Sequence, residues 1–231
     1  AWAALINSQS YKKPEGDTRV ILESALTGTN ESIRVQSLGL IAKWKISELK
    51  DSTSTLAFEQ TASDSTRLAA VRTLGKLEGA NTKKLIKLVN SKESKLLKIA
   101  GLESLARLNL AEAAKLGANM IAKGQPEDEV LYIFLNRESG SKALMEALAK
   151  INLNKTSAAK TLTKLQSIGS SDANLMNYLS KVAGIKNTAP IYSPEYVSNL
   201  AKIAAKGDAR NGKLIFSIAG CIACHKVNSS S

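Results

Sequence analysis

The residues best suited to chemistry lie together near the end of the printed sequence. The chain of 231 residues contains two cysteines and one histidine, and all three fall within five positions, as Cys221, Cys224 and His225. For a single histidine placed at random, the chance of following the second cysteine directly is roughly one in 230. The pattern Cys-x-x-Cys-His is therefore treated as a candidate site.

This pattern is typical of the covalent attachment of a c-type haem. A spacing of three places both thiols on one side of a helical turn, where they can add to the two vinyl groups of the porphyrin. The sequence therefore predicts haem c as cofactor, with thioethers at Cys221 and Cys224 and with His225 as the proximal iron ligand. In a preparation of this fragment that lacks haem, the two cysteines could pair with each other.

Three other kinds of site remain open but are less favoured. A thioredoxin-type redox pair requires a strand before the motif, whereas a helical segment precedes Cys221. A zinc site requires four nitrogen or sulfur ligands, and the chain has no further cysteine or histidine. A structural disulfide, or two inert thiols, would leave the position of His225 unexplained.

The composition favours an all-α fold. Aromatic residues make up 4% of the chain and there are 4 prolines, whereas Ala, Leu, Lys and Ser dominate. The net charge of +12 is spread along the whole chain, which favours solvated helix faces and an acidic redox partner over nucleic acid. No apolar run approaches the length of roughly 18 residues that a spanning helix needs, so no membrane span is expected.

Four segments with the helical spacing of apolar residues recur along the chain. They are aligned at Ile33, Thr66, Ser94 and Asp128, and they return with a period of roughly 30 residues. Each follows a shorter predicted helix, at 18–26, 54–61, 82–89 and 111–122. A helix pair of about 30 residues does not bury its apolar face alone, so the pairs are expected to stack into an α-solenoid.

The predicted helices are bounded by residues that favour helix ends. The predicted N-caps are Asp17, Asn30, Asp64 and Asn109, and Pro126 stands at a first helical turn. The predicted helix stops are Gly28, Gly79, Gly124, Gly140, Gly169 and Gly184. The methionines Met120, Met145 and Met176 are expected to fill the core.

The repeated segments resemble HEAT repeats, most clearly over residues 15–140. The resemblance rests on a polar turn, on Arg34 and Arg67 near the start of the second helix, and on the small and aliphatic residues that follow. It implies a HEAT-like repeat domain over residues 1–184, whose clearest alternative is an irregular helical bundle. Helices are also predicted at 142–151, 157–168 and 172–182, followed by a linker over 185–192.

Residues 193–231 are predicted to open a second domain, in which Ser193 and Pro194 begin a helix that runs to about residue 206. Residues 207–220 then resemble the first helix of a class I cytochrome c, which starts at a Gly-Asp pair and ends at the haem motif. The resemblance implies that Gly212 and Phe216 let this helix cross a C-terminal helix closely.

The chain ends at Ser231, so the cytochrome is expected to be incomplete and its distal iron ligand has no candidate here. Leu214, Phe216 and Ile218 are accordingly expected to lack their usual partners. They would pack on the preceding helix at 196–203, pack on another chain, or be disordered.

The order of the two modules resembles the C-terminal half of large exported bacterial dehydrogenase-type proteins. This resemblance implies an electron relay in the periplasm or on the outer surface, working with an upstream dehydrogenase module or a redox partner protein. The fragment itself is not expected to be an enzyme, because its only histidine, His225, belongs to the motif and leaves none for a Ser/His/Asp site. A carboxylate pair of the glycosidase type stays open, although Glu127, Asp128 and Glu129 lie where a helix N-terminus favours acids. The alternative function is a protein-interaction scaffold without redox activity.

Overall fold

The structure is a computed structural model that describes residues 12–123, 128–185, 194–204 and 207–218. All regular secondary structure in these residues is helical. The elements are α2 (Thr18–Thr27), α3 (Glu31–Trp44), η1 (Ser47–Leu49), α4 (Lys50–Phe58), α5 (Asp64–Leu74), α6 (Thr82–Val89), α7 (Lys95–Leu108), α8 (Leu110–Ala122), α9 (Asp128–Leu135), α10 (Gly140–Lys150), α11 (Lys155–Ser167), α12 (Ala173–Ala183), α13 (Pro194–Ala204) and α14 (Ala209–Ile218).

The chain divides into two compact units, Ala1–Lys186 and Asn187–Ser231. The first unit contains helices α2 to α12, and the second contains α13 and α14. The division falls within residues 185–192, for which the sequence predicts a linker.

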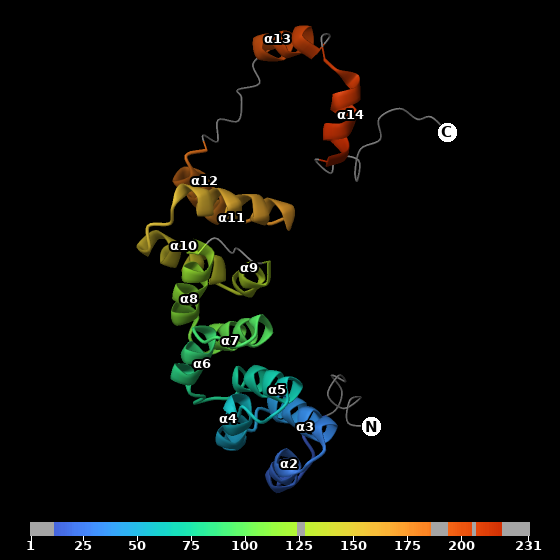
Figure 1. Ribbon diagram of the computed structural model, residues 1–231, viewed down its shortest axis with the longest axis vertical. Coiled ribbons are helices and arrows are strands. Elements are labelled where there is room, and N and C mark those ends of the chain that lie inside the picture. The colour runs from blue at the N-terminus through green and yellow to red at the C-terminus, as the bar shows by residue number, and fades with distance from the viewer. Residues whose placement is uncertain (1–11, 124–127, 186–193, 205–206, 219–231) are drawn as a thin grey trace, which may run out of the picture. The chain divides into compact units, whose positions relative to one another are not determined.

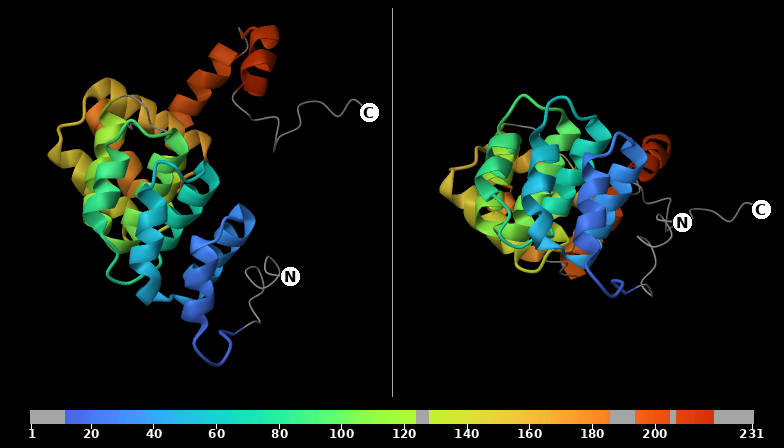
Figure 2. Two further views of the ribbon diagram at one scale, coloured as in Figure 1. Left: turned by 60° about the horizontal axis from the view of Figure 1, so that its bottom comes forward. Right: turned by 90° about the horizontal axis from the view of Figure 1, so that it is seen from below.

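The first unit is an array of stacked helix pairs. Helices α2 and α3, α4 and α5, and α6 and α7 pack against each other as pairs. The second helices of successive pairs also stack, α3 on α5, α5 on α7 and α7 on α9, while α6, α8, α10 and α12 form a row of their own. Figures 1 and 2 show these two rows side by side. The predicted all-α fold of stacked, solenoid-like helix pairs is confirmed.

One continuous apolar core runs through the array. It consists mainly of leucine and alanine, and side chains such as Leu38, Leu74, Leu105 and Phe134 are buried within it. Burying a leucine or phenylalanine side chain contributes about 1.5–3 kcal/mol. The three methionines that were predicted to fill the core are partly buried against it.

The helix starts follow the cap chemistry that the sequence suggests, with one shift. Asn30 and Asn109 accept backbone N–H groups as N-caps of α3 and α8. The N-cap of α5 is Ser63, not Asp64, because Asp64 is the first helical residue and its negative charge lies where a helix N-terminus favours an acid. The cap of α7 is Ser94, so the N-caps of the second helices follow one another at nearly even spacing.

Buried hydroxyl groups join the second helices to one another. The Ser104 hydroxyl of α7 donates to the Val71 carbonyl of α5 (2.8 Å). The Thr73 hydroxyl of α5 shares its one proton between the Leu38 carbonyl of α3 (3.1 Å) and the Ala69 carbonyl of its own helix (2.8 Å). The helices approach so closely here that a Cβ atom on Gly75 would lie 2.7 Å from the Cα of Ser104. Small and hydroxyl residues at these positions therefore set the stacking distance.

Three further helix-boundary predictions are wrong, and those at Gly124 and Pro126 lie outside the described residues. The stop expected at Gly79 is not one, because α5 already ends at Leu74 with Gly75 as its C-cap. The helix expected at 54–61 is α4, Lys50–Phe58, because η1 leads directly into it. Gly140 was expected to stop a helix, but it is the first residue of α10. A glycine is needed here because a Cβ atom would lie 2.1 Å from the Phe134 carbonyl oxygen, so the backbone of α9 leaves no room for a side chain.

Candidate functional site

The three residues of the predicted haem motif, Cys221, Cys224 and His225, lie outside the described residues. The structure describes the chain up to Ile218, the last residue of α14. Helix α14 is therefore the part of the candidate site whose geometry is known, and it ends three positions before the first cysteine.

The start of α14 is fixed by an aspartate. One carboxylate oxygen of Asp208 accepts the backbone N–H groups of Arg210 (2.9 Å) and Asn211 (3.2 Å). The Gly212 N–H donates to the Asp208 carbonyl oxygen at 2.8 Å, which closes the first helical turn. A side chain that accepts orphan N–H groups in this way stabilises a helix start by about 1 kcal/mol.

Helix α14 carries apolar side chains that the described part of the chain leaves uncovered. Leu214 and Ile215 are each 57% exposed, and Phe216 is half-buried. Successive residues of a helix are turned by about 100°, so Lys213 lies nearly opposite Ile215 and is turned by about 100° from Leu214. The helix is therefore amphipathic, and its apolar face is available to a further group.

Gly212 and Phe216, which the cytochrome resemblance singles out, are one turn apart and share a face of α14. A Cβ atom built on Gly212 meets nothing within 4 Å in the described part of the chain. The close crossing with another helix that the resemblance implies stays a prediction, because the described part of the chain places nothing against Gly212.

Helix α13 also leaves apolar side chains uncovered. Val197, Leu200 and Ile203 are about half or more exposed, with exposed fractions of 50%, 44% and 66%. Packing on residues 196–203 was one expectation for Leu214 and Phe216, but Leu214 is largely exposed as well. The side chain of Ile218 lies outside the described part.

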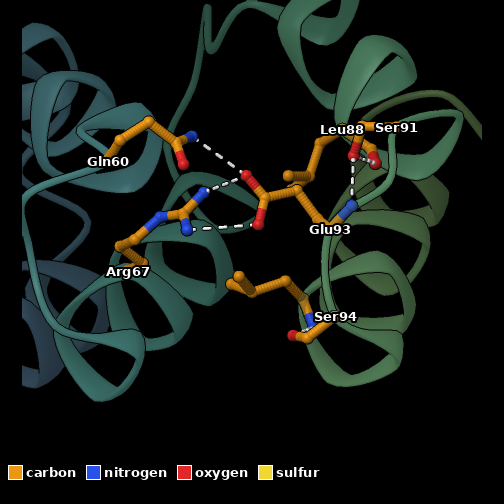
Figure 3. Close-up of polar contacts among 7 residues, drawn as sticks. Gln60, Arg67, Leu88, Ser91, Glu93 and Ser94 are labelled. Carbon is orange, nitrogen blue, oxygen red and sulfur yellow. Dashed lines mark hydrogen bonds and ion pairs between the residues drawn. The ribbon is translucent and has the colours of Figure 1, made fainter.

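In the array, the best-formed polar site is an ion pair that the sequence reasoning missed (Figure 3). The Arg67 guanidinium of α5 donates twice to Glu93, at 2.6 and 3.2 Å, and the Gln60 amide donates to the same carboxylate at 3.0 Å. The side chains of Arg67 and Glu93 are 5% and 20% exposed. Glu93 lies in the turn before α7, so the pair joins two successive helix pairs.

The turn that carries Glu93 is itself held in place. The Ser91 hydroxyl donates to the Leu88 carbonyl at 2.7 Å and accepts the Glu93 backbone N–H at 3.2 Å (Figure 3). Arg67 was noted in the sequence only as part of a repeat signature. Its partner comes from a turn 26 residues away, and no local pattern identifies it.

We expect the ion pair to make stability depend on acid pH. Hydrogen bonds from Arg67 and then Gln60 lower the pKa of Glu93 below its ordinary value of 4.5. The stabilisation is therefore complete above pH 4.5 and is lost as the pH falls through the lowered folded-state pKa. Urea unfolding at a series of acid pH values should give a shallower loss of stability for Glu93→Gln than for the wild type. Equal slopes would contradict this assignment.

Weaker polar contacts continue the connection between pairs along the array. Glu31 of α3 accepts from the hydroxyl groups of Ser63 and Ser65 at the start of α5. Lys95 of α7 lies 3.4 Å from Glu129 of α9. These groups are exposed, so each contact contributes about 0–1 kcal/mol.

Within the described residues there is no group of three or more cysteine, histidine, aspartate or glutamate side chains that could hold a metal ion. No described helix is both long and apolar enough to cross a membrane. Comparisons of the chain with known protein families, with curated proteins and with solved structures found no match to any of them.

Proposed function

We propose that this chain carries a covalently bound c-type haem and transfers electrons, with its helical array as the scaffold. The observation that carries the proposal is the sequence Cys221-Ile222-Ala223-Cys224-His225, which gathers every cysteine and histidine of the chain. Two thiols three positions apart, with an imidazole directly after the second, are the set of groups by which haem c is attached and its iron is bound.

The geometry of α14 is compatible with this proposal. A porphyrin needs apolar surface around it to exclude water, and α14 leaves Leu214 and Ile215 uncovered shortly before Cys221. The Asp208 cap sets where this helix begins, and therefore which side chains precede the motif. The residues present fit the group.

Each residue of the motif has one task. Cys221 and Cys224 would hold the haem through two thioethers, and because these arise by addition of S–H across a vinyl group, attachment would consume no oxidant. His225 would bind the iron through a ring nitrogen. When bound, the haem supplies a one-electron ferric–ferrous couple. The uncovered apolar side chains Leu214 and Ile215 of α14 would be available to cover the group.

We further propose that the array is HEAT-like and that the residues from 193 onward begin a class I cytochrome c domain. The array would hold the haem relative to an upstream oxidising module or a redox partner protein. Attachment of haem c takes place outside the cytoplasm, so the proposal includes a location in the periplasm or on the outer surface of a bacterium. The support for these points is the repeat pattern and the motif.

A redox titration of the haem-loaded chain tests the electron-transfer part of the proposal. The wild type should be reduced and reoxidised reversibly in a single one-electron step, followed by its visible absorption spectrum. His225→Ala should keep the thioethers, yet change the spectrum and the midpoint potential, because the proximal ligand is lost. A His225→Ala variant with the wild-type spectrum and potential would contradict the role given to this residue.

A further inference from the structure

A regular series of cations crosses the array. Lys45, Lys76, Arg107 and Arg137 follow one another at nearly equal intervals, each of about 30 residues. Each lies within two positions of the last residue of one helix in the row that α3, α5, α7 and α9 form. The four helices of this row therefore each carry one of these positive charges near the C-terminal end.

The four cations line a single surface hollow of about 420 Å³. Gly75, Leu77 and Leu108 form its apolar floor, and Glu78 is the one carboxylate among its lining residues. We name this hollow the basic groove. Lys45 and Lys76 are exposed, and neither side chain shares a hydrogen bond or ion pair with another residue in the described part of the chain.

The two arginines of the basic groove are poorly satisfied by the protein itself. The Nε atom of Arg137 is buried without a hydrogen-bond partner in the described part of the chain. Burial, and after it the nearby Arg107 guanidinium, lower the pKa of Arg137. Arg107 donates to the Glu103 carboxylate at 3.0 Å. Among the described residues, no carboxylate is bonded to Arg137.

The helix dipole accounts for only part of this arrangement. A cation near a helix C-terminus is favourable, which explains a lysine or arginine at each of these helix ends. It does not explain why the guanidinium groups of Arg107 and Arg137 lie close together while the Nε–H of Arg137 is buried without an acceptor in the described part of the chain. A buried N–H group without an acceptor costs free energy of folding. An anion in the basic groove would offset the repulsion between these two guanidinium groups.

We propose that the basic groove binds an extended acidic segment of a partner protein. Packed helices lie about 8–10 Å apart, so cations on the successive helices α3, α5, α7 and α9 have about that spacing. An extended polyproline-type segment advances about 3.1 Å per residue, so acidic side chains three positions apart match the series. The net charge of +12 also favours an acidic partner. This inference does not depend on the haem.

Fluorescence anisotropy on the whole chain tests the proposal. The probe is a fluorescein-labelled peptide of four Glu-Pro-Ser repeats, and the comparison probes are the same peptide with Gln for Glu and a short single-stranded DNA. Arg107→Gln/Arg137→Gln should weaken binding of the Glu peptide about 10-fold or more, since charge-assisted hydrogen bonds are lost. The matched control, Lys150→Gln/Lys160→Gln, removes the same charge from exposed sites on α10 and α11 and should leave the affinity within about 2-fold.

A second variant, Lys45→Asn/Lys76→Gln, keeps the test decisive if the arginine variant does not fold. Both lysines are exposed, and asparagine tolerates the left-handed backbone of Lys45, where φ is 52°. This variant should weaken binding of the Glu peptide as well. The proposal is overturned if the control weakens binding equally, if the Gln peptide binds as tightly as the Glu peptide, or if DNA binds more tightly than either.

Discussion

Glu93→Ala is expected to lower the free energy of unfolding of the array by about 2–4 kcal/mol. The reason is that Arg67, whose side chain is 5% exposed, would keep its charge in a nearly water-free position without a carboxylate. The amide of Gln60 would lose its acceptor as well. Urea unfolding at neutral pH, followed by far-ultraviolet circular dichroism, measures the change.

A matched control shows whether the loss of stability is specific to the buried Arg67–Glu93 pair or follows the loss of any ion pair. Glu103→Ala removes an exposed pair with Arg107 within one helix and should cost about 0.5 kcal/mol or less. Replacing both partners, as Arg67→Met/Glu93→Leu, should recover most of the stability, because no buried charge is left unpaired. If Glu93→Ala costs no more than Glu103→Ala, the buried pair does not hold the two helix pairs together.

Gly140→Ala is expected to destabilise the array by about 3 kcal/mol or more, because overpacking against backbone atoms is poorly relieved. The added Cβ atom would lie 2.1 Å from the Phe134 carbonyl oxygen and 2.9 Å from its carbon. Either α9 or α10 must shift, and Phe134 is buried in the core. Thermal unfolding of the variant should show a markedly lower midpoint temperature.

Gly28→Ala serves as the control for Gly140→Ala. A Cβ atom at Gly28 meets its nearest atom at 3.5 Å, which is ordinary van der Waals contact, and its φ of −62° suits any residue. This change should alter the stability by about 1 kcal/mol or less. A Gly140→Ala variant as stable as Gly28→Ala would show that the turn between α9 and α10 differs from the structure.

Much of the array could be predicted from the sequence because helix formation depends on local patterns. Asn30 and Asn109 cap the helices that they were expected to cap, and the helix predicted at 82–89 has those bounds. Aliphatic spacing and capping side chains act within a few residues, so they are visible without the fold.

The register between pairs was harder to predict. The sequence alignment placed Ser94 opposite Thr66, whereas the helix caps place Ser94 opposite Ser63. The two alignments differ by close to one helical turn, so the apolar residues of one segment match those of the other nearly as well in both alignments. Hydropathy alone therefore does not distinguish them. With the corrected register, the series from Lys45 to Arg137 becomes nearly regular.

Contacts between distant segments could not be predicted at all. Neither the bond from Arg67 to Glu93 nor the clash that forbids a side chain at Gly140 leaves a local signature, because each depends on how two helices pack. For the candidate site, the position of α14 and its Asp208 cap agree with the expected helix start. The roles of Cys221, Cys224 and His225 remain predictions of the motif.

The mass of the denatured protein tests the central claim most directly. The chain is expressed together with a c-type maturation system, and a known c-type cytochrome is matured in the same cells as a control. We predict that the wild type gains the mass of one haem and that Cys221→Ala/Cys224→Ala has the mass of the bare polypeptide. A wild-type chain that also has the bare mass, while the control cytochrome carries haem, would contradict covalent attachment at these cysteines.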